Sequence, residues 1–200
     1  MVVEVIVNLP APKREGGMSL EEAIDRRKSI RKYKDKPLTL EQLSQVLWAA
    51  YGINRWGKRT SPSAGACYPF EVYVVVENVE GLKPGIYHYD GKAHRLELIR
   101  EGHFRKALAE ACLGQRCVAT APVNIVIVAH YERTTGRYGE RGVRYVHIDA
   151  GHMGQNIYLQ ATALNLGTVA VGAFRDEDVK KVLEVPGEPL YIFPLGIPEE

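Results

Sequence analysis

The stretch YVHIDAGHMGQNIYLQATALNL, residues 145–166, decides the fold. Its apolar positions recur at the spacing of an α-helix, and Gly167 follows as a helix stop. These positions are Val146, Ala150, Met153, Ile157, Leu159, Ala161 and Leu164. A helix with so much apolar surface needs cover on every side, which one chain of 200 residues supplies poorly. We therefore expect a long, largely buried helix, and a second copy of the chain in a homodimer that completes its cover.

Short apolar segments, several of them rich in β-branched residues, predict a sheet around this helix. FEVYVVVE (70–77) is a β-branched run and APVNIVIVA (121–129) is a similar one, and both are typical of buried strands. YHYD and HRLELI stand on either side of a turn at Asp90 and Gly91, which predicts a hairpin. The remaining predicted strands are TVAVGAF (168–174), LYIFPLG (190–196) and, as a strand or an ordered arm, the amino-terminal segment MVVEVIVNLP (1–10).

Two capping patterns predict where the first helices begin. Ser19 with Glu22, and Thr39 with Gln42, have the spacing of a capping box. Further helices are expected at 103–113 and 176–184, and residues 131–142 are a mobile loop or the start of a helix. Helices before and between short strands, one of them long and apolar, indicate an α+β fold with a central helix under the sheet.

Composition and charge exclude several classes of protein. No repeat or linker divides the chain, so we expect one domain over residues 1–200, with 1–18 as an N-terminal arm. A formal charge of +2 provides no general field toward nucleic acid or anionic lipid. Three cysteines suggest no disulfide framework and favour the reducing cytoplasm. The apolar stretch 157–174 contains polar residues and a helix stop, so we interpret it as a helix and a strand rather than a membrane span.

Residues 26–33, RRKSIRKY, place five cations in eight residues. Cations at a helix C-terminus favour the negative end of the helix dipole, and this alone could account for the cluster. In an extended chain, however, Arg27, Ser29 and Arg31 share one side and present two guanidiniums and a hydroxyl, which suit a phosphate monoester. No P-loop or GxGxxG motif follows a strand, so a nucleoside triphosphate or a Rossmann-bound dinucleotide is not indicated.

Two segments of small residues suggest contact with a planar ligand. SPSAGACYP (61–69) has the composition of an ordinary loop, but its small residues let backbone amides approach a flat ring. LGTVAVGAF (166–174) predicts a central strand whose small residues serve either tight packing or a ring lying over the backbone. Each segment leaves both alternatives open.

The polar residues of the long helix do not predict a metal site. His147 and His152 are five residues apart and do not share a helix face, and Asp149 is their only strong companion ligand nearby. Cys67 has no base that the sequence reveals. We therefore expect neither a bound metal nor a nucleophilic triad.

Three segments, in this order, resemble the FMN-dependent nitroreductase superfamily. They are RRKSIRKY near the start, PSAGACYPFEVYVVV in the first third, and DAGHMGQNIYLQATALNLGTVAVGAF near the end. Three segments are also similar to the SagB/ThcOx-type branch of this superfamily: PSAGACYP, LKPGIYHYD and RYGERGVRYVHIDAGH. That branch includes azoline dehydrogenases of thiazole- and oxazole-containing peptides. The resemblance runs over residues 19–197. It implies a central, mostly antiparallel sheet and an intertwined homodimer with two FMN sites at the subunit interface.

The resemblance also implies which residues hold FMN. Arg27, Ser29 and Arg31 would bind its phosphate, ribityl and pyrimidine end. Pro62, Ser63, Ala64 and Gly65 would reach over from the other subunit. Ala170, Gly172 and Ala173 would lie along the isoalloxazine, with the N–H groups of the last two directed at N5 and O4. Hydride would pass through flavin N5, with Arg31 as the charge near N1 and O2, and NAD(P)H and acceptor would use the same face in turn.

Two departures from the family pattern matter. Azoline dehydrogenases of this branch carry a Lys-Tyr pair for proton abstraction, and the matching place here is Arg137-Tyr138. An arginine stays charged and is no general base at neutral pH, which leaves Tyr138 as the candidate catalytic residue. Many nitroreductases also bind phosphate with basic residues after the last strand, whereas this chain ends LGIPEE.

Three functions are therefore weighed. The first is a homodimeric FMN oxidoreductase that passes reducing equivalents from NAD(P)H to an electron-poor small molecule, such as a nitroaromatic compound or a quinone. The second is an azoline (thiazoline or oxazoline) peptide dehydrogenase, and the third is a flavin-binding dimer without turnover. The segment 131–142 has no readable specificity code, so the sequence does not choose between NADH and NADPH or name the physiological substrate.

Overall fold

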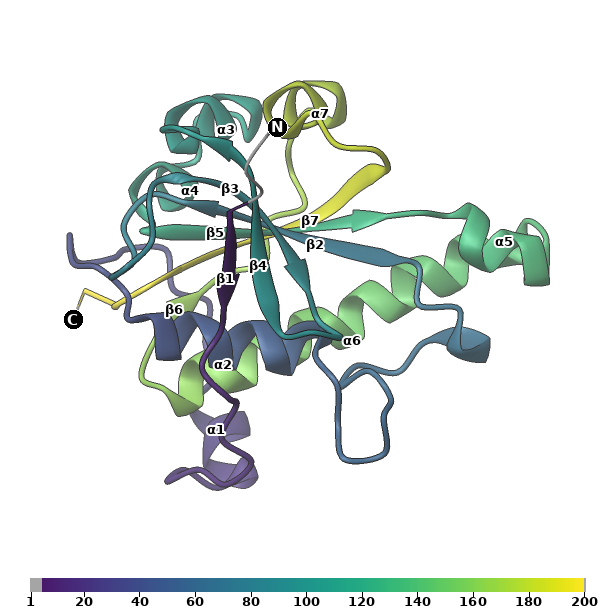
Figure 1. Ribbon diagram of the computed structural model, residues 1–200, viewed down its shortest axis with the longest axis horizontal. Coiled ribbons are helices and arrows are strands. Elements are labelled where there is room, and N and C mark those ends of the chain that lie inside the picture. The colour runs from purple at the N-terminus through teal and green to yellow at the C-terminus, as the bar shows by residue number, and fades with distance from the viewer. Residues whose placement is uncertain (1–4, 200) are drawn as a thin grey trace.

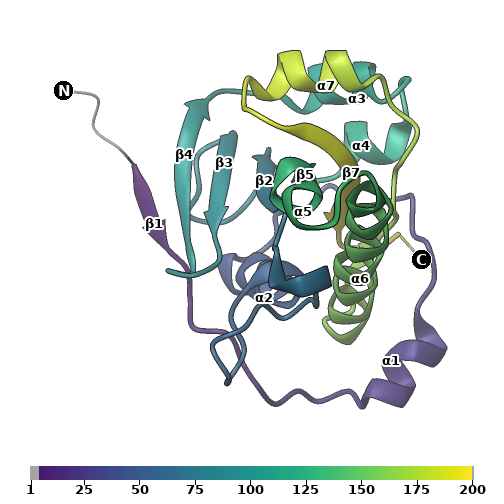
Figure 2. The same ribbon diagram turned by 90° about the vertical axis from the view of Figure 1, so that its right-hand side faces the viewer.

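The computed structural model describes residues 5–199, which form a seven-stranded sheet with helices on both faces (Figures 1 and 2). The strands are β1 (Ile6–Asn8), β2 (Phe70–Val76), β3 (Gly85–Asp90), β4 (Arg95–Glu101), β5 (Val123–Ala129), β6 (Gly167–Thr168) and β7 (Glu188–Gly196). The helices are α1 (Leu20–Arg26), α2 (Leu40–Tyr51), the 3-10 turn η1 (Ala64–Ala66), α3 (Arg105–Ala111), α4 (Arg116–Thr120), α5 (Glu132–Tyr138), α6 (Arg141–Ala163) and α7 (Asp176–Leu183). The strand order is β1-β4-β3-β2-β5-β7-β6, and all neighbouring strands are antiparallel. The predicted α+β fold is thus confirmed.

The first helices begin where the capping patterns predicted. The Ser19 hydroxyl accepts a hydrogen bond from the Glu22 N–H at 3.1 Å. At α2 the box is complete, because Thr39 and Gln42 each accept a hydrogen bond from the other's N–H. The predicted hairpin is also present as β3 and β4. Of the predicted amino-terminal strand or arm, residues 6–8 pair with β4, and residues 1–4 lie outside the described residues.

The continuous apolar runs are explained by helices on both faces of the sheet. In β2, Val72 and Val74 pack into the core under α2 and α6, whereas Tyr73 and Val75 pack under α3, α4 and α7. Successive strand residues point to opposite faces, so a sheet covered twice needs apolar residues at every position. Figure 2 shows the two helical layers, with α3, α4 and α7 above the sheet and α2 and α6 below it.

In a single chain α6 is buried along one face only, so the predicted burial of the rest depends on the second copy that was expected to complete its cover. Its buried face includes Val146, Met153 and Ile157, which pack against the sheet and α2. Outside the buried positions, Ile148 is 50% exposed, and Val143 in the first turn of the helix is 40% exposed. The helix also begins at Arg141, four residues before the predicted start. Within residues 5–199, neither α6 nor any other helix combines the length and the apolar character needed to cross a membrane.

The prediction of a central strand at 168–174 is wrong. Only Gly167–Thr168 form a strand, and it lies at the edge of the sheet beside β7. Val171 makes an isolated bridge to Ile192, after which the backbone leaves the sheet. The segment 131–142 contains the helix α5, one of the two predicted alternatives, and α4 was not predicted at all.

Candidate functional site

The basic octet of residues 26–33 begins in the last turn of α1 and continues as extended chain. α1 ends at Arg26, and Arg27 caps it with φ −57° and ψ 123°. The chain then runs beside β6, because the Ile30 N–H donates to the Thr168 carbonyl at 2.9 Å. The approach is close: a Cβ on Gly167 would lie 2.5 Å from the Ile30 side chain. The octet is therefore fixed against the start of the 167–173 segment.

Tyr158 of α6 connects the octet to that segment. Its hydroxyl shares a hydrogen bond with Ser29 Oγ at 3.0 Å and accepts one from the Ala170 N–H at 2.8 Å. The Arg27 guanidinium lies over the Tyr158 ring, with its carbon 5.1 Å from the ring centroid. Tyr158 thus brings together the predicted phosphate-binding residues of the octet and the predicted ring-binding segment at Ala170. Tyr158 itself was missed by the sequence reasoning, which counted position 158 only as part of a buried helix.

The Arg31 side chain is exposed and has no hydrogen bond or ion pair to any residue between 5 and 199. Burial raises the pKa of Tyr33 and of Cys117, and the Arg31 charge opposes both shifts. Arg27 and Ser29 thus contact Tyr158 of α6, and Arg31 is close enough to Tyr33 and Cys117 to affect their pKa values.

The backbone of Gly172 and Ala173 is free to bind a ligand. Both residues are exposed, and neither N–H has an acceptor within residues 5–199. The Ala173 carbonyl, in contrast, accepts a hydrogen bond from the Gln115 side chain at 2.7 Å, which anchors the following Ala173–Phe174 peptide. A Cβ on Gly172 would meet only the Tyr191 ring, at 3.6 Å. This segment thus offers unpaired N–H donors on an open surface of small residues.

The loop at residues 62–65 is held in an unusual conformation. The Ala64 N–H donates to Asp149 Oδ2 of α6 at 3.0 Å, and Ser63 Oγ accepts from the Tyr68 N–H at 3.0 Å. Gly65 has φ +58°, and Ala66 and Tyr68 also have positive φ, which costs non-glycine residues about 1–3 kcal/mol each. Such strain persists only where the surrounding structure enforces it, as it often does at functional sites.

The predicted Arg137-Tyr138 pair of α5 packs directly on this loop. Arg137 donates to the Gly65 carbonyl at 3.0 Å. A Cβ on Gly65 would lie 2.5 Å from the Tyr138 hydroxyl and 3.1 Å from the Arg137 guanidinium carbon. The absence of a side chain at position 65 is therefore what lets the tyrosine hydroxyl approach the loop.

Within one chain, the two halves of the candidate site stand apart along α6. Loop 62–65 is fixed at Asp149, and the octet and Ala170 meet at Tyr158. Nine helical residues at 1.5 Å each separate these attachment points by about 13 Å. Figure 1 shows α5 and the η1 turn at one end of α6, and α1 and β6 at the other. The loop and the octet of the same chain do not form one pocket.

The two histidines of α6 have ordinary partners. His147 Nε2 lies 2.8 Å from the Tyr131 hydroxyl, and His152 Nδ1 lies 3.8 Å from Asp149 Oδ1. Asp149 is buried and serves loop 62–65 through the Ala64 N–H. From the sequence, Asp149 was considered only as a possible metal ligand, and its hydrogen bond to loop 62–65 was not predicted.

A charged network joins α5 to the sheet. Arg133 of α5 forms an ion pair with Glu71 Oε1 at 2.7 Å, and His88 lies between Glu71 (2.8 Å) and Glu97 (3.2 Å). Burial alone would raise the pKa of Glu71, but hydrogen bonds from His88 and Arg133 outweigh it and lower the pKa to about 2. The hydrogen bond to Glu71 raises the pKa of His88 against the effect of burial.

This network predicts a loss of stability above neutral pH. Because the folded pKa of His88 is raised, its contribution is present below the unfolded value of 6.5 and is lost as pH rises through the folded value. Glu71 contributes above about pH 4.5 and loses its contribution as pH falls toward 2. Between pH 6 and pH 9 we expect the free energy of unfolding of the wild type to fall by about 1 kcal/mol more than that of His88→Gln. Urea denaturation at both pH values measures this, and equal pH dependence in the two proteins would contradict it.

Comparisons with known proteins agree with the fold. The model of the Nitroreductase family matches residues 24–197. The chain is 46% identical over 180 residues to MJ1384 of Methanocaldococcus jannaschii, provisionally named a nitroreductase, and the match covers 90% of this chain and 91% of that protein. It is 33% identical over 138 residues to the trifolitoxin-processing protein TfxB of Rhizobium leguminosarum bv. trifolii, which covers 66% of this chain but only 37% of TfxB.

A solved structure gives the same result. The crystal structure of a protein of Anabaena variabilis ATCC 29413, also provisionally named a nitroreductase, aligns with 99% of this chain at a TM-score of 0.88 and 33% identity. This chain spans 42% of the length of that protein.

Proposed function

Because this chain belongs to the nitroreductase family, we propose that it is an FMN-dependent oxidoreductase that takes reducing equivalents from NAD(P)H and passes them to an electron-poor small molecule, such as a nitroaromatic compound or a quinone. The observation that carries the proposal is the junction at Tyr158, where Arg27, Ser29 and Ala170 meet beside unpaired backbone donors. A cationic end and a flat, open surface of N–H groups are the two features that a flavin mononucleotide needs.

The residues present fit that cofactor. Arg27 and Ser29 would hold its phosphate through charge-assisted hydrogen bonds, and Arg31 would place positive charge near the pyrimidine end. The exposed N–H groups of Gly172 and Ala173, which have no acceptor within residues 5–199, would donate to the ring edge. Gln115 would anchor the chain directly after these two N–H groups through the Ala173 carbonyl.

A homodimer would complete the site. Loop 62–65 and the octet of one chain are separated along α6, so the loop would cover the cofactor of the other subunit. Pro62 and Gly65 at the tip of the loop are exposed and free to do this. Val143 and Ile148, which are both exposed on α6, would supply apolar surface for the contact between subunits.

The chain's own residues would orient the reactants and move protons. When bound, FMN supplies a hydride acceptor and donor at N5. Tyr138, fixed against Gly65, would bring a hydroxyl to the covering side of the site, where it can donate a proton to a reduced acceptor. Arg137 beside it keeps its charge and would bind rather than exchange protons.

Flavin titration tests the proposal. Purified protein is expected to carry or take up FMN, to elute as a dimer, and to lose flavin absorbance when NADH or NADPH is added without oxygen. Protein that neither carries nor takes up FMN would refute the proposal. Bound FMN that neither nucleotide reduces would instead favour a flavin-binding dimer without turnover.

The azoline dehydrogenase alternative is retained because of one observation. The similarity to TfxB, whose name assigns it to trifolitoxin processing, connects this chain to proteins that act on peptides. The arginine at position 137 argues against it, because the pair Arg137-Tyr138 lacks the lysine base. Oxidation of an azoline peptide without consumption of NAD(P)H would favour this alternative.

A further inference from the structure

Two arginines and two tyrosines contact one another in a row at the corner between α5 and α6. The Arg137 guanidinium lies over the Tyr138 ring at 5.5 Å, and Tyr138 meets Tyr145 edge to face at 5.1 Å. Arg141 lies over the other tyrosine, Tyr145, at 5.9 Å. Gly139, with φ +58°, turns the chain between the helices and brings the two arginine–tyrosine pairs together. We call these four residues the arginine–tyrosine column.

The arginines of the column form no ion pair with a carboxylate of the described residues. Neither Arg137 nor Arg141 forms an ion pair with any residue between 5 and 199, and the same holds for Arg144 one turn further along α6. Arg133 of the same helix, in contrast, is paired with Glu71. Arg137 uses one N–H on the Gly65 carbonyl, which leaves its remaining donors available. A guanidinium that forms no ion pair keeps its charge available to an anionic ligand.

We propose that the arginine–tyrosine column binds the anionic group of an aromatic substrate, a planar carboxylate in the simplest case. Each guanidinium offers paired N–H donors that match a carboxylate, and the tyrosine ring beside it offers apolar surface to an aromatic ring. The column packs against loop 62–65 through Gly65, so it stands where an acceptor would approach the cofactor. This location rests on the proposed function, whereas the anion preference rests on the column itself.

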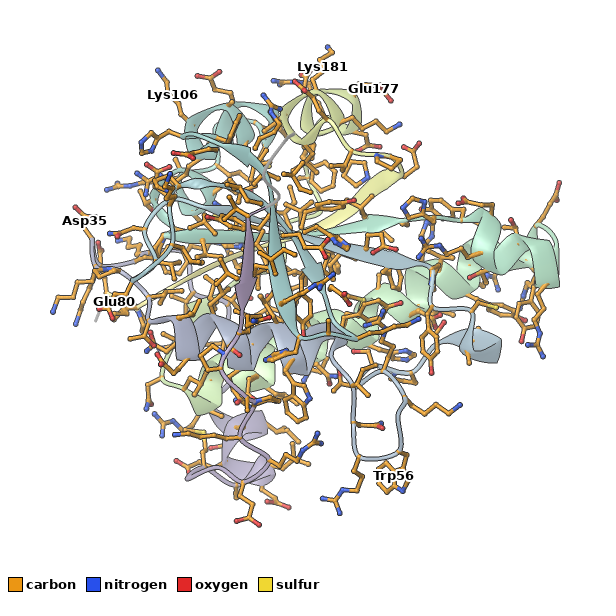
Figure 3. All side chains as sticks on the ribbon, viewed as in Figure 1. Asp35, Trp56, Glu80, Lys106, Glu177 and Lys181 are labelled. Carbon is orange, nitrogen blue, oxygen red and sulfur yellow. The ribbon has the colours of Figure 1, made fainter. Side chains whose placement is uncertain are left out.

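Matched substrates that differ only in charge test the proposal. In the wild type, 4-nitrobenzoate is expected to have a KM about tenfold or more below that of neutral 4-nitrobenzamide, with similar kcat, and the difference should shrink as salt is added. In the double variant Arg137→Gln/Arg141→Gln the two KM values should become equal. Lys106→Gln is the charge control, because Lys106 lies on α3, across the molecule from α5 (Figure 3), and should preserve the preference.

Direct binding separates this proposal from the proposed function. Isothermal titration of benzoate and benzamide into the same three proteins needs no turnover, so it decides on the column even if the protein reduces neither nitro compound. Tighter binding of benzoate that the double variant loses, with an unchanged melting temperature, supports the column. Equal binding of the two probes by the wild type, or a preference that survives in the double variant, would overturn it.

Discussion

Arg27→Ala is expected to weaken FMN binding by roughly 10- to 100-fold, which corresponds to the loss of charge-assisted hydrogen bonds of about 1.5–3 kcal/mol. Arg27 caps α1 through its backbone, which alanine retains, and its guanidinium only stacks on the Tyr158 ring. The substitution should therefore leave the fold intact and remove a charge from the phosphate end of the site. Fluorescence titration of FMN into the variant measures the change.

The neighbouring Arg26 provides a matched control for Arg27. Its guanidinium pairs with Glu22 at 2.8 Å and with the Asn165 side chain at 3.3 Å, both on the surface. Arg26→Ala removes the same unit charge one residue away, so it should change FMN affinity by less than about twofold if the contact is specific. Equal losses in both variants would indicate a general charge effect. Wild-type affinity in Arg27→Ala would reduce the octet to a solvated helix end.

Periodicity and capping residues were enough to predict most of the fold. Local signals such as Thr39 with Gln42 and the turn at Asp90 fixed the helix starts and the hairpin, because those contacts are close in sequence. The continuous apolar run 70–76 was predicted as a strand because burial on both faces is a property of the strand itself.

Position in the sheet was not predictable in the same way. The small residues of 168–174 suggested a central strand, but β6 lies at the edge and the backbone then leaves the sheet. A run of small apolar residues is compatible with both places, since neither choice requires a bulky side chain. Which one occurs depends on the pairing with β7, a contact between distant parts of the chain.

The sequence was enough to select candidate site residues by their type, but it did not predict which of them contact one another. The sequence indicated Arg27 with Ser29 and, separately, the segment at Ala170, each by composition or resemblance. Their connection through Tyr158 spans 129 residues to Ser29, and no local pattern reveals such a contact. Asp149 was likewise visible only as a polar residue in a helix, although its carboxylate fixes loop 62–65.

Tyr158→Phe is expected to weaken FMN binding by about tenfold or more, because one hydroxyl serves two partners. Its loss leaves the partly buried Ala170 N–H without its acceptor and removes the partner of the Ser29 hydroxyl, and an unpaired N–H costs up to about 1–3 kcal/mol. The phenylalanine ring still stacks under Arg27, so the effect should isolate the hydroxyl. Titration of FMN measures the affinity, and the midpoint potential of the bound flavin should also shift if the 170–173 backbone moves.

Tyr87→Phe on β3 is the matched control, since it also removes one tyrosine hydroxyl. The Tyr87 hydroxyl donates to the Lys83 carbonyl at 2.8 Å. The substitution should lower the melting temperature to a similar extent and leave FMN affinity and potential unchanged. A double-mutant cycle with Ser29→Ala adds a second criterion, because residues that share a hydrogen bond should show losses that are less than additive. Wild-type affinity and potential in Tyr158→Phe, or strictly additive losses in the cycle, would show that Tyr158 only fills space between α6 and the octet.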